Sequence, residues 1–217
     1  MNIFPTSQLI IISALLALAV AALLWAEWKS SSFGVALTKP IASTIFMIAA
    51  LLAGALTSTY GQLIFLGLIL SWLGDVFLIP KRQIFFVFGL GSFLLAHLAF
   101  ACAFILLPLE SSSLAIVAMA ISVFAIFVVR WLWPHLPGNL RLPVVAYLGA
   151  ISLMVVLAGG TVTFVGPLLL TGAILFAISD VFVARERFVS SSVTNKLCGL
   201  PLYYAAQLLF ALSIQIQ

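Results

Sequence analysis

Residues 62–82 read QLIFLGLILSWLGDVFLIPKR, an apolar run that contains one aspartate, Asp75, and ends in the basic pair Lys81 and Arg82. A helix needs about 20 mainly apolar residues to cross the hydrocarbon core of a bilayer, and this stretch has that length. It therefore predicts a transmembrane helix that carries a carboxyl group inside it and positive charge at one end.

The whole chain has the same apolar character. Of its 217 residues, 65% are hydrophobic and only 6% are charged. The surface of a soluble domain faces water, so about a quarter of its residues are usually charged. The composition excludes a soluble enzyme, a disordered chain and a nucleic-acid-binding protein, because nine Lys and Arg residues are too sparse to follow a phosphate backbone.

Breaks at polar residues, proline and glycine divide the chain into eight apolar segments. We expect one integral membrane domain over residues 1–217, an all-α bundle of eight transmembrane helices. Pro40 and Pro143 should open the second and sixth helices, because proline suits the first turn of a helix. Cys102 and Cys198 lie in apolar stretches and are expected in the core, since two cysteines form no disulfide framework. The predicted spans lie near residues 8–26, 40–57, 62–79, 84–107, 112–130, 142–160, 162–183 and 197–216.

The basic residues predict the orientation of this bundle. All nine fall in or beside the odd-numbered connections between spans, and the even-numbered connections and both tails have none. Short loops rich in Lys and Arg stay in the cytoplasm, which predicts that both termini lie outside. We expect a bacterial inner-membrane protein with its active site on the cytoplasmic side. The nine residues are Lys29, Lys39, Lys81, Arg82, Arg130, Arg141, Arg185, Arg187 and Lys196.

The protein's two aspartates, Asp75 and Asp180, both lie inside predicted spans. An ionised carboxylate costs about 2.5–3.5 kcal/mol at the centre of a span, so such residues mark functional sites by default. The segments around them are similar, SWLGDVFL at 71–78 and AISDVFVA at 177–184. This suggests two repeated four-helix halves and predicts a catalytic carboxyl pair at one depth. The alternative is that each aspartate only ends a helix or pairs with Arg82 or Arg187.

Other polar residues are expected near the same layer. Tyr203, Tyr204 and Gln207 lie in the eighth span and Tyr147 in the sixth, where tyrosines also serve as interfacial anchors. His97 is expected beyond the aspartate layer as a buried, hydrogen-bonded histidine. With only two histidines, the sequence predicts no metal site. The candidate substrate-binding residues are Lys39, Arg82, Tyr147, Arg187, Tyr203, Tyr204 and Gln207.

With these residues the chain resembles the YhhN-like lysoplasmalogenase family of integral membrane proteins. The resemblance covers most of the chain and rests on several short segments in order. They are Lys39-Pro40, Ser71 to Asp75, Gly89 to His97, Pro143 to Tyr147 with Met154, Ile178 to Asp180 with Arg187-Phe188, and Tyr203-Tyr204 with Gln207.

The resemblance implies an eight-helix hydrolase without a cofactor that acts on a lysophospholipid in the bilayer. It would cleave the vinyl ether bond of lysoplasmalogen to a fatty aldehyde and glycerophosphoethanolamine or glycerophosphocholine. Such hydrolysis begins with protonation of the β-carbon, followed by addition of water to an oxocarbenium ion. Asp75 and Asp180 would divide the acid and base work, and which of them is the acid is left open.

A proton-coupled transporter or lipid-translocating protein is the alternative function. Carboxylates inside spans and repeated halves also suit a transporter, which is expected to have broken helices at matching positions of its halves. Gly166-Pro167 is such a break near the outer end of the seventh span, and the third span has no equivalent.

Overall fold

The computed structural model describes residues 6–216, and over this range the chain forms nine α-helices and no strand. A π-helical turn, Arg185–Val189, continues α8, and short 3₁₀ turns follow α5 and α9. The α-helices are α1 Thr6–Trp28, α2 Ser32–Leu52, α3 Thr59–Phe77, α4 Gln83–Ile105, α5 Ser111–Leu132, α6 Arg141–Gly160, α7 Val162–Val165, α8 Leu168–Ala184 and α9 Val193–Ser213.

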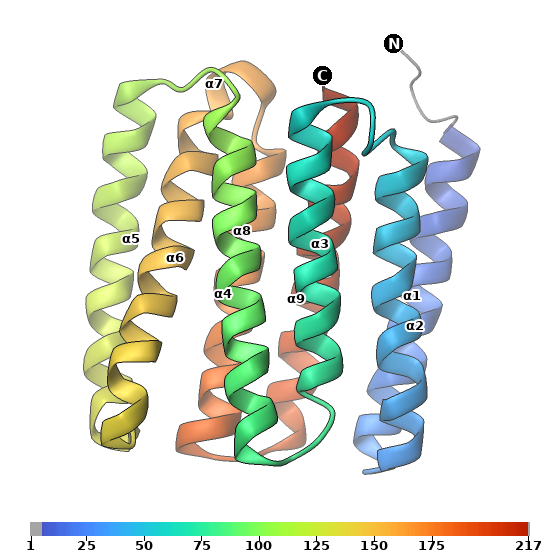
Figure 1. Ribbon diagram of the computed structural model, residues 1–217, viewed down its shortest axis with the longest axis vertical. Helices are drawn as coiled ribbons and strands as arrows, with labels where there is room; N and C mark the ends of the chain where they lie inside the picture. Colours follow the sequence, from blue (N-terminus) through green and yellow to red (C-terminus); the bar gives the residue numbers. More distant parts are fainter. Residues whose placement is uncertain (1–5, 217) are drawn as a thin grey trace.

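Seven helical segments in the described range are long and apolar enough to cross a membrane. They correspond to the first seven predicted spans and make the chain an integral membrane protein. The eighth predicted span falls on α9, which is not among the seven and carries the polar residues Asn195, Lys196 and Gln207. Figure 1 shows α9 running beside the other long helices along their common axis. An eight-span bundle therefore stays a prediction.

The connections separate by charge in space as well as in sequence. In Figure 1, the α1–α2, α3–α4, α5–α6 and α8–α9 connections lie at the lower end, while α9 ends at the upper end. These four connections are the ones with which the basic residues are associated. The charge asymmetry that the sequence predicts is thus a real asymmetry of the fold, and its direction across the membrane stays a prediction.

The second helix begins earlier than the sequence predicts. Ser31 caps α2 by accepting a hydrogen bond from the Gly34 N–H at 3.1 Å, so the helix starts at Ser32 and Pro40 lies inside it. An internal proline removes one helical hydrogen bond, a loss that neighbouring helices and side chains tolerate in membrane proteins. Lys39 consequently lies within the bundle and not in a loop, where the sequence placed it. Pro143 does lie in the first turn of α6, as predicted.

The seventh span is neither continuous nor as short as predicted. Gly166 adopts a positive φ of 75° and separates the short α7 from α8. At the other end the π-helical turn continues the helix to Val189. Asp180 therefore lies about two turns or more from the lower end of the segment, deeper than a span ending at residue 183 predicts.

The core is built from aromatic rings on the central helices. Phe100, Phe176 and Phe210 are fully buried, and the Phe100 and Phe210 centroids are 4.6 Å apart. A Cβ on Gly67 would lie 2.4 Å from the Phe100 ring, so this glycine lets α3 and α4 approach closely.

Cys102 and Cys198 are exposed, and their predicted core position is wrong, because an apolar residue of a membrane helix can also face lipid.

Candidate active site

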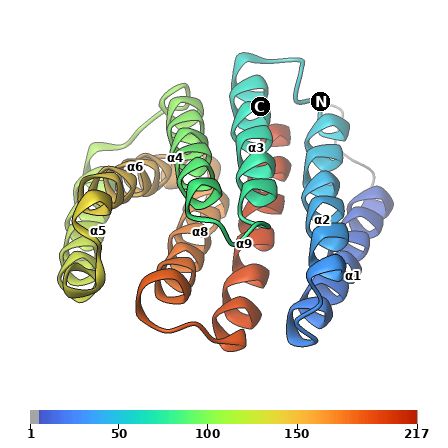
Figure 2. The ribbon, with the colours of Figure 1, turned by 60° about the horizontal axis from the view of Figure 1, so that its bottom comes forward.

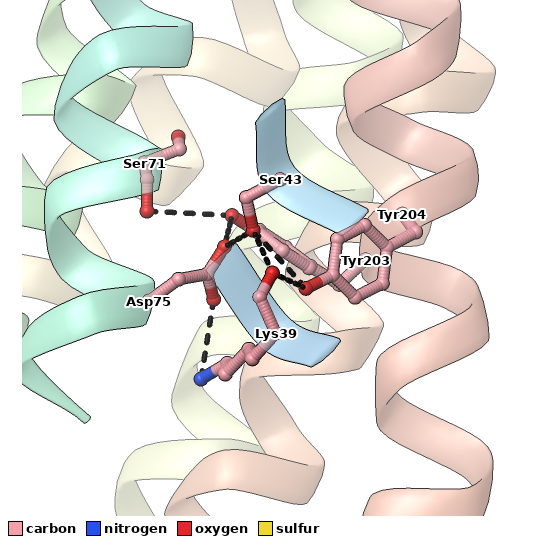
Figure 3. Close-up of polar contacts among 6 residues, drawn as sticks. All are labelled: Lys39, Ser43, Ser71, Asp75, Tyr203 and Tyr204. Atoms are coloured by element: carbon pink, nitrogen blue, oxygen red, sulfur yellow. Dashed lines mark hydrogen bonds and ion pairs between the residues drawn. The ribbon is translucent and has the colours of Figure 1, made fainter. Parts of the chain in front are cut away.

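A buried ion pair joins α2 to α3. The Lys39 Nζ lies 3.2 Å from Asp75 Oδ1, and the two residues are 8% and 2% exposed. Figure 3 shows the ammonium and the carboxylate facing each other between the helices. A buried charge is tolerated when it is paired and hydrogen-bonded. Asp75 therefore pairs with Lys39, and not with Arg82 as the alternative interpretation of the sequence proposed.

Two hydroxyl groups donate hydrogen bonds to the second carboxylate oxygen of Asp75, Oδ2. Ser43 Oγ and Tyr203 OH each donate a hydrogen bond to Asp75 Oδ2 at 2.6 Å. The Tyr204 OH lies 3.1 Å from Ser43 Oγ and donates to the Lys39 carbonyl at 3.3 Å, which joins α9 to the same network. Both oxygens of Asp75 thus face donors, an arrangement that suits an ionised carboxylate because that form only accepts hydrogen bonds.

The second aspartate has a histidine for a partner. Asp180 Oδ2 lies 3.4 Å from His97 Nε2, and His97 is completely buried. His97 Nδ1 lies 2.6 Å from the Phe93 carbonyl oxygen. A carbonyl only accepts hydrogen bonds, so this nitrogen carries a proton and Nε2 is the atom turned toward Asp180. The expectation that His97 lies beyond the aspartate layer is wrong, because His97 lies beside Asp180. The π-helical turn after α8 also places Asp180 further from the end of its segment than predicted.

Aromatic rings separate the two carboxyl groups. The Phe176 ring packs on His97, with centroids 4.4 Å apart, and on Tyr203, with centroids 5.4 Å apart. The Tyr147 ring packs against the His97 ring, with centroids 5.2 Å apart, and the Tyr147 hydroxyl is near Asp180. Each aspartate therefore has its own polar partners within one continuous aromatic packing.

One cavity connects these centres. Its volume is about 580 Å³, and Asp75, Asp180, Lys39, Tyr147 and Tyr203 all line it. This volume lies within the range of ligand pockets, which run from about 300 to 1,000 Å³. Apolar side chains of α5, α6 and α8 supply much of the wall. The arrangement suits a long apolar ligand with a reactive group near its middle or end.

The remaining predicted site residues divide into two groups. Arg187 lines the cavity, where its guanidinium lies 4.5 Å above the Phe86 ring and contacts Gln83. Arg82, Tyr204 and Gln207 do not line it. Gln207 is fully buried, and neither polar atom of its side chain has a hydrogen-bond partner among the described residues.

The sequence does not single out Ser43, and it predicts His97 as a buried, hydrogen-bonded residue but at the wrong depth. Ser43 lies one turn after Lys39 on α2, a spacing that places both side chains on one helix face, and this signal was available. His97 lies closer to Asp180 than the sequence predicts, and the seventh segment extends beyond residue 183 to Val189. No pattern in the sequence indicates the π-helical turn that lowers this end.

Comparison with known proteins identifies the family. The model of the YhhN family matches residues 34–214. The chain belongs to the YhhN family. The resemblance found in the sequence is thereby confirmed, and the matched range contains every residue of the two carboxyl centres.

Relatives of this YhhN-family chain include mammalian and bacterial proteins. It is 33% identical to lysoplasmalogenase TMEM86A of Bos taurus over 88% of the chain and 82% of the bovine protein. It is 32% identical to lysoplasmalogenase TMEM86B of Mus musculus over 92% of the chain and 83% of that protein. A lysoplasmalogenase of Mycobacterium tuberculosis is 39% identical over 64% of the chain, a match that spans about half of the mycobacterial protein, 53%. No solved structure gave a significant match.

The buried ion pair predicts a distinctive pattern of stability. Replacing Lys39 with Met leaves Asp75 as an unpaired buried charge and should lower the free energy of unfolding by about 3 kcal/mol or more. Adding Asp75→Asn should restore most of this loss, as measured by thermal unfolding of the detergent-solubilised protein.

Lys196→Met is the matched control for this experiment. Lys196 pairs with Glu27 at 2.7 Å, but its side chain is one-third exposed, so its loss should cost about 1 kcal/mol or less. If Lys39→Met is no more destabilising than Lys196→Met, the ion pair with Asp75 does not hold the site together.

Proposed function

We propose that this protein is a lysoplasmalogenase, a membrane enzyme that hydrolyses the vinyl ether bond of lysoplasmalogen. The products are a fatty aldehyde and a glycerophosphoethanolamine or glycerophosphocholine. The names of its YhhN-family relatives support this activity. The observation that carries the proposal is one apolar cavity lined by two carboxyl groups with different partners.

Asp75 is the ionised member of the pair. Lys39 and the hydroxyls of Ser43 and Tyr203 surround its carboxylate with donors. In a site that excludes much of the water, a fixed negative charge stabilises a developing cation strongly. Asp75 stabilises the oxocarbenium ion that forms when the vinyl ether is protonated.

The Asp180–His97 pair supplies the proton. Because His97 Nδ1 is hydrogen-bonded to Phe93, a neutral His97 presents only an acceptor at Nε2. A protonated Asp180 completes that contact, and burial favours this neutral pair over two separated charges. Asp180 and His97 therefore act together as the acid, and the proton belongs to the pair as a unit.

The proposed reaction consumes one water molecule and leaves these residues in their starting protonation states. The pair gives its proton to the β-carbon, which leaves an oxocarbenium ion opposite Asp75. Water adds to the α-carbon of the alkenyl chain and returns a proton to the Asp180–His97 pair. The resulting hemiacetal collapses to the aldehyde and the glycerol hydroxyl. The bond between the α-carbon and the ether oxygen breaks, and nothing is oxidised or reduced.

Arg187 and Lys81 hold the phosphate at the mouth of the cavity. Both line it, and the contacts of Arg187 with Phe86 and Gln83 fix its side chain there. A guanidinium forms charge-assisted, bidentate hydrogen bonds with phosphate. Lys39, by contrast, is already engaged by Asp75 and is not the phosphate-binding residue.

In the membrane, we place α9 as an eighth span and the basic end of the bundle in the cytoplasm. α9 carries both Tyr203 and Tyr204, whose hydroxyls meet the Asp75 cluster inside the bundle. The basic connections all lie at the end where the cavity opens toward Lys81, Arg187 and Lys196. A substrate from the inner leaflet then reaches the carboxyl groups without crossing the bilayer.

A transporter is less well supported by the same helices. Within residues 6–216, only the seventh segment is broken, at Gly166, and α3 runs without interruption from Thr59 to Phe77. Paired broken helices are the expected feature of a repeat-based transporter.

The first test is removal of each carboxyl group. Asp180→Asn cannot donate the proton and should lower aldehyde release from lysoplasmalogen by about a hundredfold or more. Asp75→Asn is made together with Lys39→Met, so that no charge is left unpaired, and should be similarly inactive while remaining folded. Aldehyde is measured with the purified protein in detergent.

Glu110→Gln is the control, because this carboxyl group lies on the α4–α5 connection at the opposite end of the bundle. It should keep wild-type activity. Full activity of Asp180→Asn would reject the acid role, and absence of aldehyde from the wild-type protein would reject the enzyme.

The second test concerns the phosphate. Arg187→Gln should raise KM for lysoplasmalogen about tenfold with a smaller effect on kcat, because it removes a charge-assisted contact to an unreacting group. Arg141→Gln is the matched control, since Arg141 also lies over an aromatic ring, that of Trp133 at 4.7 Å, but does not line the cavity. Equal changes of KM in the two variants would show that Arg187 does not bind the substrate.

A further inference from the structure

A separate group of apolar side chains surrounds one side of the cavity. Val128, Leu132, Leu136 and Leu148 form a cluster distinct from the main core, and all four line the cavity. They come from α5, the turn after it, and α6. We call this group the α5–α6 chamber. It contains no charged side chain, so it suits the hydrocarbon part of a ligand.

A second, shallow and open hollow, which we call the outer hollow, is lined by residues of the same two helices. Its volume is about 320 Å³, and its walls include Ile126, Val129, Arg130, Val145, Leu148 and Gly149. Val129, Val145 and Leu148 line both this hollow and the main cavity. The side chains of these three residues therefore form the partition between the two spaces.

α5 is the least buried of the long helices. Only 6% of its apolar membrane-spanning stretch is buried, whereas 50% of the corresponding stretch of α4 is buried. Figure 2 shows α5 at the edge of the bundle beside α6, and its buried residues are Val128 and Leu132. Because α5 packs extensively against one long helix only, α6, fewer contacts hold it in place than hold the central helices.

We infer that the substrate's alkyl chain occupies the α5–α6 chamber and enters it from the bilayer between α5 and α6. This inference rests on the proposed function and extends it to the binding of the chain. In lysoplasmalogen the vinyl ether lies between the glycerol and the alkyl chain. With the phosphate at Arg187 and the vinyl ether at the carboxyl groups, the chain extends into the remaining apolar space. That space is the chamber.

Arg130 supports the same entry route. It lines the outer hollow near the lower end of α5, where a cation attracts the phosphate of a lipid in the adjacent leaflet. The hollow therefore offers a lysolipid a positive charge at the headgroup level and apolar walls above it.

A substitution at Gly149 can block the proposed entry route between α5 and α6. A Cβ at this position would meet no described atom within 4 Å, so a larger side chain is accommodated without displacing the helix. Gly149→Phe should fill the outer hollow beside Val145 and Leu148. Gly91→Phe is the matched control, because Gly91 is also exposed on a long helix with no described atom within 4 Å of its Cβ, and it lines neither space.

The experiment compares long-chain and short-chain 1-alkenyl lysophospholipids as substrates in detergent. Gly149→Phe should lower kcat/KM for the long chain by about tenfold or more, because burial of only a few methylenes accounts for such a factor. It should change kcat/KM for the short chain less than twofold. Gly91→Phe should leave both values at the wild-type level.

Binding of a non-hydrolysable 1-O-hexadecyl lysophospholipid gives a readout that does not depend on the chemistry. Gly149→Phe should weaken its binding, and the Asp180→Asn variant should bind it as the wild type does. If Gly149→Phe binds the ether lipid normally and cleaves both chain lengths equally well, the entry route is wrong even though the enzyme is active. If the wild type binds the ether lipid but releases no aldehyde, the proposed function fails and the chamber remains a lipid site.

Discussion

The ion pair between Lys39 and Asp75 is the interaction on which the site depends. It lies inside a helix bundle, where each charge alone would be too costly to bury. The Ser31 cap starts α2 early enough to carry Lys39 into the bundle, and the Tyr203 hydroxyl of α9 donates a hydrogen bond to Asp75. The Asp75 carboxylate thus joins the consecutive helices α2 and α3 to α9, near the other end of the chain.

The contrast between the two aspartates gives the site its chemistry. Asp75 has an ammonium and two hydroxyl donors, and Asp180 has a histidine nitrogen whose tautomer is set by the Phe93 carbonyl. Two carboxyl groups whose surroundings favour different protonation states are a familiar basis for dividing acid and electrostatic roles. Phe176 and Tyr203 keep them apart while both face the same space.

Much of the fold follows from local patterns in the sequence. Apolar run length predicts the seven spanning helices, and the distribution of Lys and Arg predicts which connections share one end of the bundle. The same patterns fail where a cap or a π-helical turn shifts a boundary by several residues. The Ser31 cap places Lys39 inside a helix and not in a loop, and the turn at Arg185–Val189 places Asp180 further from the end of its segment than predicted.

The candidate site was predicted in its residue types more than in its contacts. The unusual cost of an aspartate in a span singles out Asp75 and Asp180, and its position in the eighth span places Tyr203 near the same layer. The sequence did not indicate that Lys39 would pair with Asp75, since that contact depends on how α2 and α3 pack. Nor did it indicate that Arg82 and Gln207 would lie away from the cavity.

Infrared spectroscopy of the carboxyl groups distinguishes the protonation states of Asp75 and Asp180. We expect a carbonyl stretch from one buried protonated carboxylic acid in the wild-type protein at neutral pH. This band should persist in Lys39→Met with Asp75→Asn and disappear in Asp180→Asn. A band that persists in Asp180→Asn and disappears when Asp75 is replaced would show that the two aspartates have the opposite roles, with Asp75 protonated and Asp180 ionised.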